Sequence, residues 1–318
     1  MRWPDRLRGT AAVLTAIILC ACAPAIRATV SRAPAPEQMA EFWAEPADLS
    51  SRDLYWGPGG EQNAPDPAGP WRLVARKSPS FRKFSPGFDV RDPRGIVWSA
   101  KIGAEAQSEV VSSRLMWALG YHQPPTYYVR SWSIEGERWG GPKEPARFRP
   151  DLPGMKKVAD WSWHENPFVG TPPWRGALVF MAMINNSDLK PAQNTLYELD
   201  HVSEGARRWY VVRDLGLSLG ETGRWYPVRN DVGLFEREKF ILGLRPDGTV
   251  RFNYSGRWKE LFRDLRPEDV RWTCERLSRL SDRQWEDVFR AAEYRPEIAQ
   301  RFIRRFKEKI AEGLSLGR

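Results

Sequence analysis

The feature that most constrains this chain is a hairpin pattern between two acidic positions, Asp188 and Asp214. An apolar run over 176–184 precedes the first position and predicts a helix. Alternating apolar residues over 195–199 and 209–212, with a polar turn between them, predict two strands that end at the second position. Because a hairpin returns the chain to its starting point, we expect Asn194, where the hairpin begins, and Asp214, where it ends, to lie close together.

The residue types around the hairpin suit phosphoryl transfer. This reaction needs a carboxylate to orient the attacking hydroxyl, and oxygen ligands that hold Mg²⁺ against the phosphates. Asp188 could orient the hydroxyl, while Asn194 and Asp214 could bind the metal. Lys190 could lie near the transferring phosphate. The simpler interpretation is a loop and hairpin of any mixed domain, because Asp, Asn and Pro favour turns and Asp-Leu-Gly after a strand is common by chance.

A second group of charged residues precedes this unit. Strand patterns separated by Pro and Gly turns occupy 71–101, and the last strand ends on Lys101. The segment 103–120 is predicted to be an amphipathic helix, with Glu105 and Glu109 four residues apart on one face. Either glutamate could pair with the lysine. The alternative is that all three are solvated charges at the junction of two elements, as is usual for such pairs.

The two groups together resemble the active site of an atypical member of the protein-kinase-like superfamily. The positions that carry the resemblance are Lys101, Glu109 or Glu105, Asp188, Asn194 and Asp214. The resemblance spans roughly 71–310 and is closer to HipA-type toxin kinases and spore-coat CotH kinases than to eukaryotic protein kinases. It implies an α+β, two-lobed kinase-like fold, with a small β-rich lobe containing one helix over 71–134 and a larger, mainly helical lobe over 135–318.

The resemblance also implies ATP with Mg²⁺ or Mn²⁺ between the lobes. Asp188 would be the catalytic base or orienting group, with Lys190 beside it. Lys101 would bind the phosphates and be held by one of the two glutamates. Asn194 and Asp214 would be the metal ligands.

The sequence departs from the usual kinase pattern in three places. Asn186 and Ser187 stand where His-Arg usually precedes the Asp, and Asn194 lies one residue later than usual. No G-x-G-x-x-G motif is present, and 80–87 is predicted to be a short substitute that covers the nucleotide.

The last part of the sequence predicts three helices. They begin at Pro267, at Ser281 and at Pro296. Ser281 followed by Gln284 is a capping pattern, and proline is favoured in the first turn of a helix.

The N-terminal residues are predicted to be an export signal. A basic start and a short apolar stretch lie within 1–28, and Leu-Cys-Ala-Cys resembles a bacterial lipobox with a lipid on Cys22. An ordinary cleaved signal peptide is the alternative. The segment 29–70 is rich in Pro and Ala and is predicted to be a mobile tether. We therefore expect a lipoprotein of the bacterial cell envelope, facing the periplasm from the outer or inner membrane.

Composition narrows the range of possible functions further. Three Cys and three His give neither a disulfide framework nor an expected zinc site. A net charge of +9 suits anionic lipid or phosphate-bearing ligands, and no nucleic-acid-binding motif is present. The leading hypothesis is a membrane-anchored kinase-like protein that transfers phosphate or nucleotide to a hydroxyl of an unknown protein or small molecule. The alternative is a non-catalytic binding or scaffold module, whereas a hydrolase has little support without G-x-S-x-G.

Overall fold

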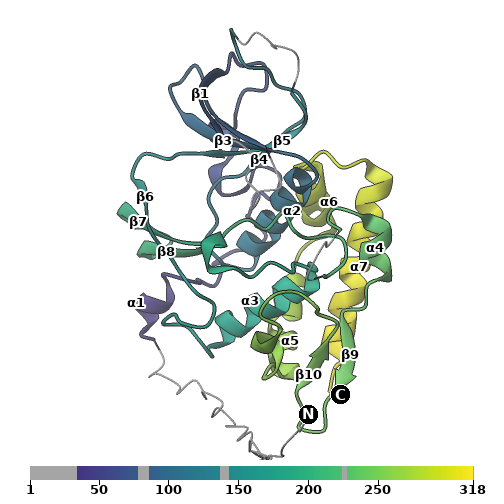
Figure 1. Ribbon diagram of the computed structural model, residues 1–318. Coiled ribbons are helices and arrows are strands. Elements are labelled where there is room, and N and C mark those ends of the chain that lie inside the picture. The colour runs from purple at the N-terminus through teal and green to yellow at the C-terminus, as the bar shows by residue number, and fades with distance from the viewer. Residues whose placement is uncertain (1–33, 78–85, 137–142, 224–227, 318) are drawn as a thin grey trace, which may run out of the picture. The chain divides into compact units, whose positions relative to one another are not determined.

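The computed structural model describes residues 34–77, 86–136, 143–223 and 228–317 (Figure 1). All of them belong to one compact unit, 32–318. The predicted export signal over 1–28, with Cys22, lies outside the described residues.

A five-stranded antiparallel sheet forms the β-rich part of the fold (Figure 1). Its strand order is β1 (Arg72–Lys77), β2 (Gly87–Arg91), β3 (Val97–Ile102), β5 (Ala146–Pro150) and β4 (Tyr127–Val129). One face is apolar and packs Trp98 and Phe148 around the buried Trp71, whose ring centroid lies 4.8 Å from that of Phe148. β5 comes from beyond the predicted lobe boundary at 134, so the sheet extends further along the chain than the sequence pattern indicated.

Helix α2 (Glu105–Ala118) lies against the other face of this sheet. The sequence predicts an amphipathic helix, but α2 is buried almost all round because it is covered by the sheet on one side and by the helical part on the other. Several of its polar side chains are hydrogen-bonded, as in the pairs of Ser112 with Ser218 and Ser113 with Gln123.

The predicted helix and hairpin around Asp188 are present. Helix α3 (Pro172–Met183) begins after Thr171, whose hydroxyl accepts a hydrogen bond from the Trp174 amide. The strands of the hairpin are β7 (Asn194–Ser203) and β8 (Ala206–Val212), and β6 (Met155–Asp160) completes a three-stranded antiparallel sheet.

The C-terminal part is mainly helical. Its elements are α4 (Val232–Arg237), the hairpin strands β9 (Ile241–Leu244) and β10 (Val250–Phe252), α5 (Pro267–Leu277), α6 (Asp282–Arg290) and α7 (Pro296–Ser315). Short 3-10 helices are η1 (Gly57–Gly59), η2 (Glu61–Asn63), η3 (Pro191–Gln193) and η4 (Lys259–Phe262). The predicted capping box of Ser281 with Gln284 starts α6.

These elements confirm an α+β fold with two hydrophobic clusters. The smaller cluster lies in the five-stranded sheet, and the larger one joins α2, α3 and the C-terminal helices. Among the described residues, no helix combines the length and apolar character needed to cross a membrane.

The described part of the predicted tether packs on the domain, so the expectation of a mobile linker is wrong for 34–70. After the short helix α1 (Pro36–Met39), the side chain of Phe42 is fully buried, and its ring stacks on Phe168 at a centroid distance of 5.0 Å. Trp43 Nε1 donates to the Leu119 carbonyl at 2.8 Å. Burial of two large aromatic side chains outweighs the loop-like Pro and Ala composition around them.

Candidate functional site

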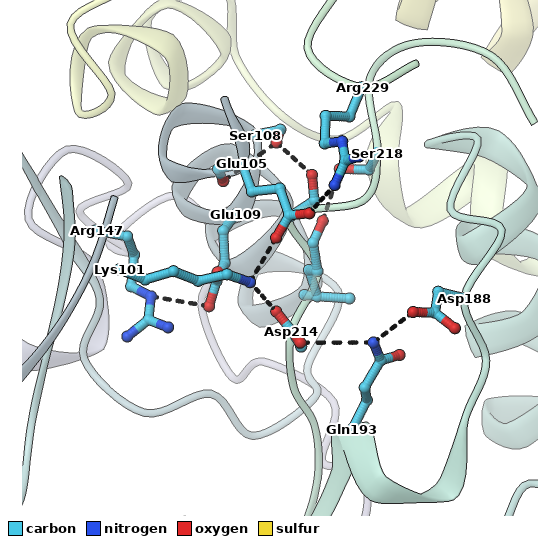
Figure 2. A network of polar contacts seen from close by, with 12 residues as sticks. Lys101, Glu105, Ser108, Glu109, Arg147, Asp188, Gln193, Asp214, Ser218 and Arg229 are labelled. Atoms are coloured by element: carbon cyan, nitrogen blue, oxygen red, sulfur yellow. Dashed lines mark hydrogen bonds and ion pairs between the residues drawn. The ribbon is translucent and has the colours of Figure 1, made fainter. Parts of the chain in front are cut away.

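Lys101, at the end of β3, is the centre of the candidate site (Figure 2). Its Nζ lies 2.6 Å from Glu105 Oε2 and 3.5 Å from Glu109 Oε2, and it also contacts the Asp214 carboxylate. Both glutamates that the sequence left as alternatives therefore contact Lys101. The lysine joins the sheet, α2 and the segment after β8 in one cluster of charges.

Glu109 is the more deeply held of the two glutamates. Its side chain is 1% exposed, and its Oε1 lies 3.0 Å from Arg147 Nε and 2.7 Å from Arg149 Nη2. Burial raises the pKa of this carboxyl, but Arg147, Lys101 and Arg149 outweigh burial and hold the pKa well below its usual range. Glu105 instead shares its carboxylate between Lys101 and Arg229.

The charge of Lys101 is maintained by its neighbours. Burial favours the neutral amine, yet the carboxylates of Glu109, Asp214 and Glu105 raise the pKa of Lys101 above its ordinary value. Lys101 is therefore an ammonium ion at neutral pH. An ammonium ion in this position can bind a phosphate group.

The segment after Asp214 packs closely against α2 through Gly216. A Cβ at Gly216 would lie 2.7 Å from Glu105 Cβ and 2.9 Å from the Glu105 carbonyl oxygen, so a larger residue does not fit. Ser108 Oγ donates to the Gly216 carbonyl at 2.6 Å. Asp214 itself has a φ of 56°, a conformation that is uncommon for a residue with a side chain and that is concentrated at functional sites.

Gln193 links Asp214 to Asp188 (Figure 2). Its Nε2 donates to Asp188 Oδ2 at 2.7 Å and to Asp214 Oδ2 at 3.5 Å. Lys190 Nζ also lies 2.7 Å from Asp188 Oδ2, and Arg257 Nε lies 3.4 Å from Asp188 Oδ1. The two aspartates predicted on either side of the hairpin are thus brought together with Lys101.

Asn194 is the predicted site residue that does not join this network. It is the first residue of β7, pairs with Val212 in the hairpin and is almost fully buried. Its side-chain amide donates to the Trp161 carbonyl at 3.3 Å. Gln193 therefore occupies the position between the two aspartates that the sequence analysis gave to Asn194.

Sequence reasoning missed three residues of this site. Gln193 had a signal, because Asn194 lies one residue later than the kinase pattern expects and Gln193 fills the usual position. Arg147 and Arg149 had none, because they lie in a Gly- and Pro-rich region with no assigned element. The predicted nucleotide cover over 80–87 lies largely outside the described residues.

Oxygen atoms around Gln193 are suited to a divalent cation. In the described parts of the chain, no group of three or more His, Cys, Asp or Glu side chains could hold a metal ion. However, Gln193 Oε1 is buried without a hydrogen-bond partner, and the Asp214 carboxylate, which its Nε2 faces, is 41% exposed. If the amide turns over so that Oε1 faces Asp214, one carboxylate and one amide oxygen fit Mg²⁺, which usually keeps several waters and takes its remaining ligands from substrate phosphates.

Comparisons with known proteins add little to what the geometry of the site indicates. No family model and no curated protein matches the chain. Among solved structures, the chain is similar to a crystal structure of the Helicobacter pylori proinflammatory kinase CtkA, at 10% sequence identity and a TM-score of 0.35. The similarity covers 78% of this chain and 98% of that chain. At this TM-score it establishes neither a shared family nor a shared activity.

Proposed function

We propose that this protein is a kinase-like phosphotransferase that binds ATP with a divalent cation. The observation that carries the proposal is the contact of Lys101 with carboxylates of α2 and with Asp214, while Gln193 connects Asp214 to Asp188. Phosphoryl transfer requires a cation for the phosphates, ligands for Mg²⁺ and a carboxylate near the attacking hydroxyl. These three requirements are met here by groups from three separate segments.

Each residue has a distinct role in this proposal. Lys101 binds the phosphate chain, and Glu109 fixes its side chain. Asp214 and Gln193 hold the divalent cation, which neutralises phosphate charge when it is bound. Asp188 orients the acceptor hydroxyl and accepts its proton as the new oxygen–phosphorus bond forms and the bond between the γ-phosphorus and ADP breaks.

A non-catalytic binding module is the second candidate function. The observation in its favour is that both carboxylate oxygens of Asp188 already face cations, Lys190 and Arg257. These contacts occupy the oxygens that an acceptor hydroxyl would need to approach. Such a protein would bind the nucleotide without turning it over.

The proposal is tested by thermal unfolding of the full chain with ATP, with and without Mg²⁺ or Mn²⁺. A ligand at about 100 times its Kd stabilises the native state by roughly 2.7 kcal/mol. We expect a metal-dependent rise in Tm for the wild type that is lost in Asp214→Asn. A rise in Tm without formation of ADP from ATP in the presence of candidate hydroxyl acceptors would favour the binding module, and no rise with any nucleotide or metal would contradict both functions.

We also propose that the protein is anchored to the bacterial cell envelope by a lipid on Cys22. The support is the lipobox-like Leu-Cys-Ala-Cys sequence after a basic and apolar start. Mass spectrometry of the membrane fraction should find acylation in the wild type and none in Cys22→Ser. An unmodified, fully soluble wild-type chain would contradict the anchor.

A further inference from the structure

The inner face of the five-stranded sheet carries an unusual set of cations. Side chains alternate along β3 and β5, so that Trp98 and Phe148 enter the apolar cluster while Lys101, Arg147 and Arg149 point to the opposite face. Both arginines are more than nine-tenths buried. Arg147 Nε lies 3.0 Å from Glu109 Oε1, whereas Arg149 Nε lacks a hydrogen-bond partner. Arg149 therefore retains a donor that is not used within the protein.

Arg213 adds a further cation near this face, because its charge interacts with those of Arg149, Arg147 and Glu109. It directly follows β8 and precedes Asp214 in the chain. Its Nη1 donates to Thr195 Oγ1 at 3.3 Å, and its guanidinium lies 5.8 Å from the Tyr197 ring centroid. No carboxylate of a described residue forms an ion pair with Arg213.

The charges of this cluster do not balance. The cations are Lys101, Arg147, Arg149 and Arg213, and the carboxylates that face them are Glu109 and Asp214. Four positive charges against two negative charges leave an excess of two, and Glu105 is shared with a further cation, Arg229. An excess of charge in a buried site is unfavourable unless a ligand neutralises it.

The pKa of Arg147 agrees with an excess of positive charge. Burial lowers this pKa, although Glu109 partly opposes the effect. The protein alone thus disfavours the charged form of Arg147, and a bound anion would favour it.

We infer that Arg147, Arg149 and Arg213 form an anion site beside Lys101 that recognises a polyphosphate chain, so that inorganic tripolyphosphate is a sufficient ligand. This inference rests on the proposed function in one respect, namely that the bound polyphosphate is used as a phosphate donor. The excess of positive charge in the cluster does not depend on that function. Guanidinium groups present paired donors that match phosphate oxygens. Two adjacent phosphate groups would neutralise the excess charge, and a nucleoside without phosphates would not.

The test uses calorimetric titration and thermal unfolding of the full chain with tripolyphosphate, ATP and adenosine, each with and without Mg²⁺. The variant is Arg213→Gln, with Arg207→Gln as the matched control, because Arg207 is an exposed residue of β8. We expect tripolyphosphate to bind and raise Tm, adenosine to do neither, and Arg213→Gln to weaken tripolyphosphate binding by about tenfold or more. Without ligand, Arg213→Gln should keep or raise the Tm, because it removes a partly buried charge that no carboxylate in the described part of the chain pairs with.

The outcomes separate this inference from the proposed function. Binding of ATP without binding of tripolyphosphate would overturn the inference and leave the function in place. Binding of tripolyphosphate that depends on Arg213, without metal-dependent binding of ATP, would overturn the function alone. Binding of neither ligand would overturn both. A lower Tm in Arg213→Gln with unchanged tripolyphosphate affinity would make Arg213 a structural residue and overturn the inference.

Discussion

Two lysines of this protein, Lys101 with a side chain 17% exposed and Lys309 with none exposed, lie in opposite environments. Lys101 Nζ is surrounded by carboxylates from α2 and from the segment after β8. Lys309, on α7, is fully buried; its Nζ donates to the Met183 carbonyl at 2.8 Å and to Asn185 Oδ1 at 3.0 Å. The same ammonium lies 4.0 Å from the Phe235 ring centroid. No carboxylate of a described residue pairs with it.

The comparison shows that burial alone does not define a candidate site. For both lysines burial favours the neutral amine, but carboxylates reverse this effect at Lys101 and raise its pKa. At Lys309 burial prevails, with a contribution from Arg305, and the pKa falls well below its ordinary value. A persistent charge with several partners suits a phosphate ligand, whereas a lysine among aromatic rings and carbonyls serves packing.

The largest effect should come from removing the carboxylate that balances the Lys101 region. Glu109→Gln leaves Arg147 and Arg149 buried without a counter-charge, and breaking a buried ion pair in this way costs about 3–5 kcal/mol. Urea unfolding measures this loss. Glu105→Gln is the control, and it should cost less because Glu105 lies closer to solvent. Equal losses in the two variants would mean that Glu109 has no special structural role.

Replacing each lysine by methionine tests directly whether the two environments contribute differently to stability. Lys101→Met removes charge-assisted contacts to three carboxylates and should lower the free energy of unfolding by about 2 kcal/mol. Lys309→Met keeps the apolar stem and removes a buried amine, so the change should stay within about 1 kcal/mol. Urea unfolding of both variants at neutral pH gives the two values. A larger loss in Lys309→Met would show that its two hydrogen bonds matter more than the carboxylate cluster.

The third effect is the pH dependence that distinguishes the two lysines. The folded-state pKa of Lys309 is lowered, so the unfolded chain binds more protons and stability should rise as pH rises towards 10.5. This slope is at most about 1.4 kcal/mol per pH unit, and Lys309→Met should lack it. The pKa of Lys101 is raised, so its contribution should stay constant below pH 10.5 and be lost above it. Midpoints of urea unfolding measured across this pH range test the direction of both changes. If stability changes with pH equally in Lys309→Met and in the wild type, the lowered pKa of Lys309 is contradicted.

Local patterns were sufficient to predict part of the fold. The hairpin over β7 and β8 follows from alternation, and the start of α6 follows from Ser281 with Gln284. Lys101 could be placed near Asp214 only through the resemblance, because no local pattern joins residues so far apart in sequence. The α+β class was likewise predicted through the resemblance and not from any single local pattern.

Other features depend on tertiary contacts that no local pattern contains. Phe42 lies in a Pro- and Ala-rich stretch, and only its partners in the core show that this stretch is folded. Arg147 and Arg149 point to the site because β5 pairs with β3 in one register, and a shift of one residue would turn them to the other face. In the same way, a difference of one residue along the chain decides whether Gln193 or Asn194 lies between the two aspartates.

Calorimetric titration of the full chain with ATP and Mg²⁺ tests the central claim most directly, with wild type, Lys101→Met and Lys309→Met compared side by side. The account predicts metal-dependent binding to the wild type and to Lys309→Met, and a loss of affinity of about 100-fold or more in Lys101→Met. Equal affinity in Lys101→Met, or no binding to a wild-type chain that unfolds cooperatively, would contradict a nucleotide site at Lys101.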